Sequence, residues 1–237
     1  MKLFPSKDRA RITEIFSSLQ GEGPRMGERQ LFIRFESCHL ACEYCDERMK
    51  RGRELPLAEV LRAVDALEKM SGPHAHVSLT GGEPLLYTAF LKPLCRELQK
   101  RKYRTLLETN GVLGGELKKV LGFCHLIAMD MKLASVTGGK SLLNEHAEFL
   151  KVAVKKETYV KIAVSPKIDR AEYGAHIRMV ASLAPQTPVF LQPVSERGEG
   201  IPAPKLLKLL EQLQRIGRER LPDVRLGIQL HKVLKIR

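Results

Sequence analysis

The chain has 237 residues, of which 43% are hydrophobic, and it is therefore expected to form a single domain over residues 1–237 with a substantial core. No apolar run approaches the roughly 18 residues of a membrane span and no signal peptide is recognisable, so the five cysteines are expected in a reducing cytoplasm. The formal charge of +13 is spread along the chain, aromatic residues make up 5% and Trp is absent, which argues against nucleic acid as a partner.

Strands and helices alternate along the chain. Expected strands cover residues 31–36, 76–80, 104–108, 126–131, 159–164, 189–192 and 224–229. Apolar residues at helical spacing predict helices over residues 57–70, 85–102, 116–121, 142–154, 171–183 and 204–218. This order predicts βαβ units and hence an α/β fold, a partial (β/α) barrel of about six parallel strands. Polar loops at the carboxyl ends of these strands should meet on one face, where barrel enzymes place their sites.

Three cysteines follow the first of these strands, Cys38, Cys42 and Cys45, in the pattern Cys-x3-Cys-x2-Cys. Soft thiolates select zinc, copper(I) or iron–sulfur clusters, and a structural zinc site would need a fourth ligand. A 4Fe-4S cube held by three cysteines instead keeps one iron open for a small molecule. The triplet alone would also suit a zinc knuckle, a redox dithiol or core positions. Cys95 and Cys124 stand alone and are expected in the core.

The second strand runs directly into Gly81, Gly82, Glu83 and Pro84. Paired glycines let the backbone turn sharply and approach a ligand, and Glu83 can accept a hydrogen bond from a cationic amine. In isolation these residues would be an ordinary strand-to-helix turn. Together with the upstream cysteines they resemble the motifs of the radical S-adenosylmethionine (SAM) enzymes, which implies a 4Fe-4S cluster whose open iron binds SAM.

The N-terminal residues 12–24 contain the sequence Gln-Gly-Glu-Gly and resemble a motif of the 7-carboxy-7-deazaguanine synthase family of radical SAM enzymes. The agreement continues through residues 31–38, 43–46, 79–84, 108–111, 191–193 and 229–232. The resemblance implies a lyase of queuosine and deazapurine biosynthesis that converts 6-carboxy-5,6,7,8-tetrahydropterin to 7-carboxy-7-deazaguanine with loss of ammonia. It also implies Mg²⁺, a one-electron donor such as flavodoxin, and a homodimer.

The same resemblance assigns residues to the substrate and to SAM. Expected substrate contacts are Leu19, Gln20, Gly21, Glu22, Arg34 and Thr80. Expected SAM contacts are Tyr44, Cys45, Asp46, Gly82, Glu83, Asp130, Met131, Lys132, Gln192, Pro193, Val194 and Ser195. Arg34 is the expected partner of the substrate carboxylate, because a guanidinium fork binds carboxylates bidentately. No side chain is expected to act as a strong base in the first step, since the radical derived from SAM abstracts the hydrogen.

Two departures from the family pattern bear on function. The family usually has Thr after its Cys-Asp pair, where the hydroxyl helps to bind Mg²⁺, and this chain has Glu47. A carboxylate suits a hard cation, so Glu47 is expected to bind Mg²⁺; the alternative is that it points away and the site has lost a ligand. The turn at residues 130–132 is closer to that of glycyl-radical activating enzymes, which keeps an activating enzyme or peptide maturase as the alternative function. A non-catalytic metal- or RNA-binding module is the remote alternative.

Overall fold

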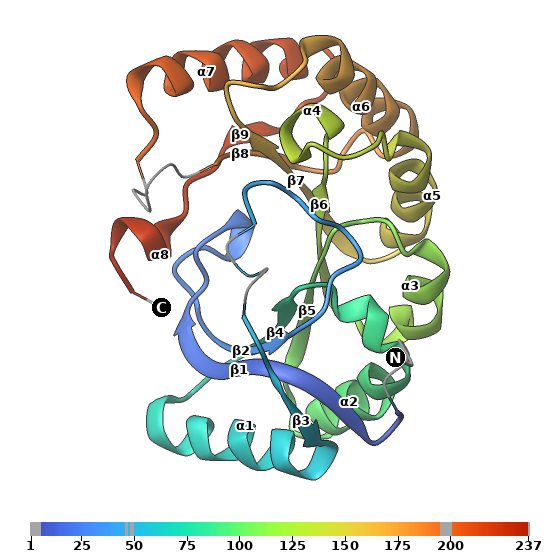
Figure 1. The fold of residues 1–237 in the computed structure, drawn as a ribbon, viewed down its shortest axis with the longest axis vertical. Helices are drawn as coiled ribbons and strands as arrows, with labels where there is room; N and C mark the ends of the chain where they lie inside the picture. Colours follow the sequence, from blue (N-terminus) through green and yellow to red (C-terminus); the bar gives the residue numbers. More distant parts are fainter. Residues whose placement is uncertain (1–5, 46, 48–49, 195–200, 237) are drawn as a thin grey trace.

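The computed structural model describes residues 6–45, 47, 50–194 and 201–236 (Figure 1). The strands are β1 (Arg9–Leu19), β2 (Arg29–Phe35), β3 (Arg53–Pro56), β4 (His76–Gly81), β5 (Arg104–Thr109), β6 (Leu126–Met131), β7 (Glu157–Val164), β8 (Val189–Pro193) and β9 (Val224–Leu226). The helices are α1 (Leu57–Ser71), α2 (Thr88–Lys100), α3 (Gly114–Val120), α4 (Ala134–Thr137), α5 (Leu143–Ala153), α6 (Arg170–Leu183), α7 (Pro204–Arg218) and α8 (Leu230–Val233). Within these described ranges the nine strands form one sheet, in the order β3-β1-β2-β4-β5-β6-β7-β8-β9.

The parallel part of the sheet confirms the predicted α/β fold. Strands β2 and β4 to β9 pair in parallel, and each connection between them contains a helix. These helices form an outer arc around the strands in Figure 1, as a partial (β/α) barrel requires. Strands β2 and β4 to β9 correspond to the seven expected strands, of which the first six are of ordinary length and β9 has three residues.

Two antiparallel strands at the N-terminal edge were not expected. Strand β1 pairs with β2 on one side and with β3 on the other. A β-bulge between Ile12 and Glu14 interrupts the alternation along β1, because one extra residue moves every later side chain to the opposite face. Ile12 therefore packs in the core, whereas Glu14 and Phe16 face the inside of the barrel. This break removes the regular period that identifies a strand in sequence.

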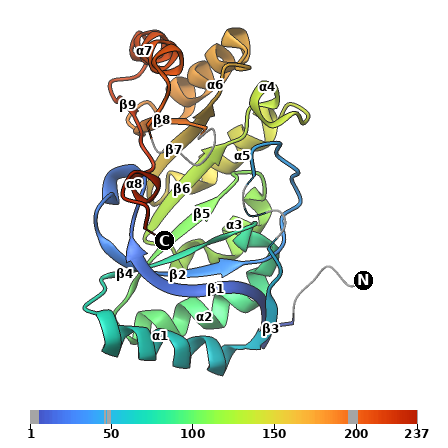
Figure 2. The ribbon, with the colours of Figure 1, turned by 60° about the vertical axis from the view of Figure 1, so that its left-hand side comes forward.

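The C-terminal strand is shorter than expected. It ends at Leu226 instead of continuing to residue 229, although the Gly227 N–H still donates to the Leu191 carbonyl oxygen at 2.8 Å. The Leu230 N–H then donates to the carbonyl oxygen of Gly21 at 3.0 Å, which draws the chain across to the loop that follows β1. The short helix α8 begins there, beside that loop in Figure 2.

The two faces of the parallel sheet pack against different parts of the molecule. Outward-facing residues of the strands pack against the helices in the main core, for example Leu107, Ile127 and Ile162. On the inward face a second apolar cluster fills one end of the barrel, and its members are Leu106, Leu126, Ala128, Tyr159 and Phe190. Because side chains alternate along a strand, the next inward positions lie beyond this plug, toward the carboxyl ends of the strands.

Candidate active site

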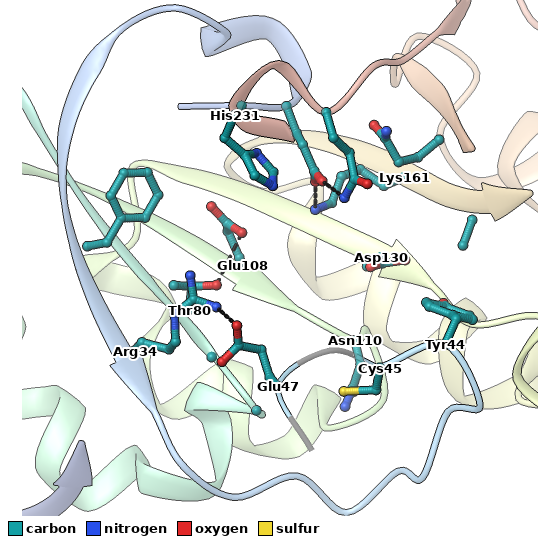
Figure 3. A pocket seen from close by; sticks show the side chains of 18 of the residues that line it. Arg34, Tyr44, Cys45, Glu47, Thr80, Glu108, Asn110, Asp130, Lys161 and His231 are labelled. Atoms are coloured by element: carbon teal, nitrogen blue, oxygen red, sulfur yellow. Dashed lines mark hydrogen bonds and ion pairs between the residues drawn. The ribbon is translucent and has the colours of Figure 1, made fainter. Parts of the chain in front are cut away.

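Beyond the apolar plug, the inner face opens into a cavity of about 860 Å³. The next inward residue of each central strand is polar and lines this cavity, and these residues are Thr80, Glu108, Asp130, Lys161 and Gln192. Parallel pairing sets them at similar heights, with Arg34 beside Thr80 and Asp130 beside Lys161. The prediction that polar strand ends meet on one rim is confirmed. Figure 3 shows Thr80, Arg34 and Glu47 on one side of the cavity and Tyr44 on the other, with Cys45 between them.

All three cysteines of the triplet line this cavity. The Cys38 thiol accepts hydrogen bonds from the Leu40 N–H at 3.4 Å and from the Asn110 side-chain amide at 3.7 Å. Among the described residues no three His, Cys, Asp or Glu side chains converge closely enough for a single metal ion. Three thiolates that line one cavity could each bind one of three irons of a cube. Cys95 and Cys124 are 1% and 3% exposed, which confirms them as core residues.

The paired glycines bring the end of β4 close to the start of the cysteine loop. Gly81 has φ of +119°, and a Cβ on it would collide with backbone atoms of Phe35. A Cβ on Gly82 would likewise collide with the carbonyl group of Ser37. The Glu83 N–H donates to that same Ser37 oxygen at 2.7 Å. The glycines are therefore needed for this close backbone approach, which fixes the position where the cysteine loop begins.

Glu83 is fully buried, with 0% exposure. Its carboxylate accepts hydrogen bonds from the Leu85 N–H at 3.0 Å, the Thr109 hydroxyl at 2.9 Å and the Asn110 N–H at 2.9 Å. Burial raises the pKa of Glu83 to about 7, against the opposing effect of these donors. In this structure Glu83 therefore anchors the loop after β5, and its expected contact with an amine of SAM stays a prediction.

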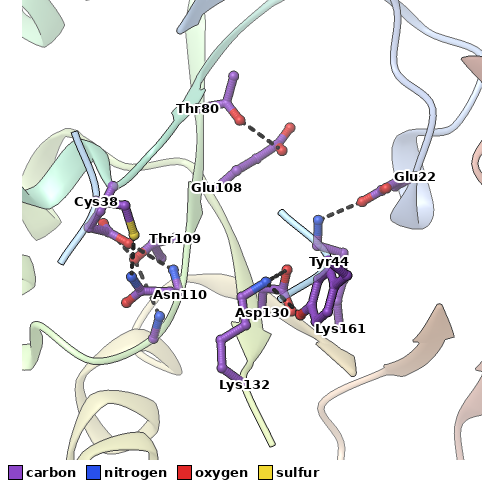
Figure 4. A network of polar contacts seen from close by, with 12 residues as sticks. Glu22, Cys38, Tyr44, Thr80, Glu108, Thr109, Asn110, Asp130, Lys132 and Lys161 are labelled. Atoms are coloured by element: carbon purple, nitrogen blue, oxygen red, sulfur yellow. Dashed lines mark hydrogen bonds and ion pairs between the residues drawn. The ribbon is translucent and has the colours of Figure 1, made fainter. Parts of the chain in front are cut away.

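The end of β6 forms a compact polar cluster that Figure 4 shows. The Lys132 ammonium donates to Asp130 Oδ2 at 2.7 Å and to the Tyr44 hydroxyl at 3.2 Å. Burial would lower the pKa of Lys132, but Asp130 and Tyr44 raise it above its ordinary value, and burial raises the pKa of Tyr44 to about 12. Asp130 Oδ1 and Gln192 Nε2 are buried without a hydrogen-bond partner among the described residues. Both residues line the cavity, which suits a polar ligand at this end.

A hydrogen-bond network centred on the Glu108 carboxylate covers the floor at the opposite end. The Gln20 amide donates to Glu108 Oε1 at 3.0 Å and to Gln30 Oε1 at 3.3 Å, and the Thr80 hydroxyl donates to Glu108 Oε2 at 3.2 Å. The Ser78 hydroxyl supports Gln30 from below at 2.7 Å. Glu108 is thereby held with its carboxylate at the surface of the cavity, drawn beside Thr80 in Figures 3 and 4.

A largely buried ion pair closes the side wall of this end. Lys161 Nζ lies 2.6 Å from Glu22 Oε2, and the Gln229 amide donates to Glu22 Oε1 at 2.9 Å. Burial would raise the pKa of Glu22, but Lys161 and Gln229 hold it at about 2. Gly21 lies against His231, since a Cβ there would collide with the imidazole ring. The N-terminal motif and the C-terminal segment therefore form one wall.

Arg34 is engaged by two carboxylates of the protein itself. Its guanidinium forms ion pairs with Glu47 and, at 3.5 Å, with Glu14. Lys50 also pairs with Glu47 at 2.7 Å. Glu47 lines the cavity, and its Oε2 atom is buried without a hydrogen-bond partner among the described residues. The structure thus brings Glu47 to the substrate end, where its carboxylate occupies the guanidinium that was expected to hold a ligand carboxylate.

Most residues expected at the site lie on the cavity wall. Those that line it are Leu19, Gln20, Gly21, Glu22, Arg34, Tyr44, Cys45, Glu47, Thr80, Gly82, Asp130, Lys132, Gln192, Pro193 and Val194. Met131 is 0% exposed and its side chain packs in the main core, so only its backbone could meet a ligand. Asp46 and Ser195 lie outside the described residues.

Several residues of the wall were not among the expected site residues, including Glu108, Asn110, Lys161, Gln229 and His231. Glu108 and Asn110 belong to the segment 108–111 at the end of an expected strand, which the rule that polar strand ends meet already placed on this rim, although no role in binding was assigned to them. Lys161 carries a weaker signal, a charged residue inside an otherwise apolar strand. Gln229 and His231 lie in the segment 229–232 that resembles the family, but their place on the wall depends on the contact of the C-terminal segment with Gly21.

Comparison with known proteins agrees with this geometry. Residues 32–132 match the Radical SAM superfamily. A 7-carboxy-7-deazaguanine synthase from Geobacter sulfurreducens is 33% identical, over 97% of this chain and 98% of its own. Another from Methanothermobacter thermautotrophicus is 31% identical, over 97% and 98% of the two chains. The crystal structure of QueE from Escherichia coli has the same fold, with a TM-score of 0.63 and 22% identity over 94% of this chain and 95% of that chain.

Proposed function

Because the chain belongs to the 7-carboxy-7-deazaguanine synthase family of radical SAM enzymes, we propose that it contracts the ring of 6-carboxy-5,6,7,8-tetrahydropterin to 7-carboxy-7-deazaguanine with loss of ammonia. This is a lyase reaction of deazapurine biosynthesis. One observation carries the proposal: a single cavity joins the three-thiol loop to a polar wall built on Glu108 and the Glu22–Lys161 pair. Such a cavity suits a small polar heterocycle beside a cluster.

When bound, the 4Fe-4S cluster and SAM supply the electron and the radical that begin the reaction. The thiolates of Cys38, Cys42 and Cys45 would hold the cluster, since all three line the cavity. Asp130 offers an acceptor atom and Gln192 a donor atom to SAM, since both atoms are buried without a partner in the part of the chain that the structure describes. Orientation and exclusion of water are therefore the contributions of the protein at this end.

The opposite end fits the two polar edges of the substrate. The pyrimidine edge of a pterin carries N–H donors beside a carbonyl acceptor, and Glu108 with Gln20 offers matching acceptors and donors. Arg34 would hold the substrate carboxylate after Glu47 releases it. The Glu22–Lys161 pair stiffens the wall of this end, because Lys161 is buried and Glu22 is also held by the Gln229 amide.

The proposal includes Mg²⁺ as a further cofactor, with Glu47 as its ligand. Glu47 Oε2 is buried, unpartnered among the described residues and on the cavity wall, which supports it as a ligand for a hard cation. The nearby Arg34 and Lys50 compete for the same carboxylate. Mg²⁺ would therefore bind together with the substrate carboxylate, when Arg34 exchanges Glu47 for that carboxylate.

The proposal also includes a one-electron donor such as flavodoxin, a homodimer and a cytoplasmic location. These follow from the family and, for the location, from cysteines that are unpaired in the described structure. None of the described helices has the length and apolar character needed to cross a membrane.

The decisive experiment is anaerobic incubation of the reconstituted protein with SAM, dithionite and the carboxytetrahydropterin. We expect 7-carboxy-7-deazaguanine and ammonia in equal amounts, with product detected by its absorbance and mass. Release of 5′-deoxyadenosine without the deazaguanine would remove the substrate assignment and favour an activating enzyme or peptide maturase. Residues Gln229, His231, Lys232 and Ile236 of the C-terminal segment also line the cavity, which supports a small molecule over a protein substrate.

A further inference from the structure

Two histidines, His146 on α5 and His176 on α6, are completely buried behind the cavity wall that the ends of β5 and β6 form. Both have 0% exposure, and their rings pack edge to face with centroids 5.5 Å apart. A buried imidazole is costly unless its nitrogens have partners. The hydrogen-bond partners of this pair connect the backbone of α6 to the end of β6, beside the SAM end of the cavity.

The hydrogen bonds of the pair run in one direction. His176 Nδ1 lies 2.9 Å from the Glu172 carbonyl oxygen, so this nitrogen carries the proton and Nε2 of the same ring is an acceptor. His146 Nδ1 lies 3.4 Å from that acceptor and is therefore the donor. His146 Nε2 is left with a lone pair, which accepts from the backbone N–H of Lys132 at 3.4 Å.

The opposite tautomer would satisfy fewer partners. His146 Nε2 also lies 3.3 Å from the Asn110 carbonyl oxygen, to which it could donate only if it carried the proton. His176 Nδ1 would then have no proton for the Glu172 oxygen, and the Lys132 N–H would lose this acceptor. Burial lowers the pKa of His146 to about 3, so the neutral ring cannot donate from both nitrogens. The tautomer with the proton on Nδ1 is therefore the stable one.

The segment that leaves β6 is held from behind at two places. His146 binds the N–H of Lys132, and the Glu172 carboxylate accepts from the first two backbone amides of α4 at 2.6 and 3.0 Å. On the cavity side, the Lys132 ammonium holds Asp130 at 2.7 Å, as Figure 4 shows. The orientation of this ion pair thus depends on backbone that α5 and α6 fix through buried polar contacts.

We propose that His146, with its tautomer set by His176, is a positioning residue for SAM: it fixes the Lys132 backbone and thereby the Asp130–Lys132 pair that faces the cofactor. This rests on the proposed function, because that function places SAM at the end of β6. His146 itself touches neither substrate nor cofactor.

The test compares two variants that differ in which ring nitrogen they replace. In His146→Gln the longer side chain puts an amide near the place of Nε2, where its oxygen can accept from Lys132. In His146→Asn the amide reaches only the place of Nδ1. We expect His146→Asn to weaken SAM binding to the reconstituted protein about tenfold, the loss of roughly one hydrogen bond, with kcat at saturating SAM changed much less. His146→Gln should bind SAM within about threefold of wild type.

Two measurements on the iron-free protein are independent of catalysis. Exchange of the Lys132 amide proton should be faster in His146→Asn and close to wild type in His146→Gln. Nitrogen NMR of the wild-type histidines should show His146 protonated on Nδ1, whether or not either variant folds. Equal SAM affinity for the two variants, or a proton on Nε2 of His146, would overturn the proposal. Wild-type protein that binds no SAM would instead refute the proposed function, while the amide exchange would still report on the His146 contact.

Discussion

Two carboxylates at opposite ends of the cavity are held in opposite ways: the largely buried Glu22 on the wall of the substrate end and the fully buried Glu83 behind the cluster end. Glu22 at the substrate end faces the Lys161 ammonium at 2.6 Å and a Gln229 amide at 2.9 Å. Glu83 behind the cluster end accepts from two backbone amides and one hydroxyl, without a cation in these hydrogen bonds. Their pKa values differ accordingly, at about 2 for Glu22 and about 7 for Glu83.

This difference separates two ways of building a rigid wall. At the substrate end, the opposite charges of Glu22 and Lys161 hold segments that are distant in sequence, and we call this group the charged wall. Removal of one partner leaves the charge of the other without its counter-ion. Behind the cluster end, uncharged donors of the backbone and of Thr109 hold Glu83, and we call this group the neutral wall. Removal of one of its partners leaves only an unsatisfied donor or acceptor. The charged wall should therefore be more sensitive to mutation, and the two walls should respond to pH in opposite directions.

The largest effect should come from the cysteine loop. Replacing Cys38, Cys42 or Cys45 by Ala should abolish the brown chromophore and SAM cleavage, because two thiolates cannot hold the cube. The stability of the iron-free protein should change little for Cys38 and Cys45, whose residues are exposed. Iron content and SAM cleavage are the measurements.

The buried cysteines provide the matched control. Replacing Cys95 or Cys124 by Ala should leave iron content intact and cost only some packing stability, about 1 kcal/mol. Loss of iron in either control would show that the ligand set is wrong.

The next largest effect should come from the ion pair of the charged wall. Lys161→Met leaves Glu22 buried without its cation, which should cost about 3–5 kcal/mol in the free energy of unfolding. Adding Glu22→Gln to Lys161→Met should recover much of this loss, because no buried charge is then left alone. Urea unfolding of the single and double variants measures the coupling. Additive effects of the two substitutions would contradict a charged wall.

The neutral wall should show a smaller effect with the opposite dependence on pH. Glu83 has a pKa raised from 4.5 to about 7, so its contribution is present below pH 4.5 and is lost as pH rises toward 7. Glu22 has a pKa lowered from 4.5 to about 2, so its contribution is present above pH 4.5 and is lost as pH falls toward 2. Glu83→Gln should remove the dependence of stability on pH between 4.5 and 7 and lower the free energy of unfolding by about 1–3 kcal/mol.

The measurement is the urea midpoint of the iron-free protein against pH, for wild type, Glu83→Gln and Glu22→Gln. Each variant serves as the control for the other, because each should flatten only its own pH window. If the urea midpoint changes with pH between 4.5 and 7 as much in Glu83→Gln as in wild type, the Glu83 carboxyl does not titrate as its burial requires.

The sequence predicts the strands and their polar ends better than the charged wall. Strand β6 and helix α7 have the expected bounds, because regular apolar periods identify them, and the strand-end rule places Thr80, Asp130 and Gln192 together. The charged wall depends on contacts that no local pattern encodes. Glu22 and Gln229 are 207 residues apart, and the inward direction of Lys161 follows from the register of the whole sheet.

The smallest expected effect concerns Glu47, which stands between the two kinds of wall. Its carboxylate is paired with Arg34 and Lys50, yet one of its oxygens is buried without a hydrogen-bond partner among the described residues. If that oxygen binds Mg²⁺, Glu47→Gln should raise the Mg²⁺ concentration for half-maximal turnover about tenfold, since a charged ligand becomes neutral.

Glu47→Thr should restore a hydroxyl ligand and leave Arg34 free for the substrate carboxylate. The KM for the pterin should then fall, because Glu47 no longer competes for the guanidinium. Turnover that is the same with and without chelator, in wild type and both variants, would show that Glu47 serves only to neutralise Arg34, as a member of the charged wall.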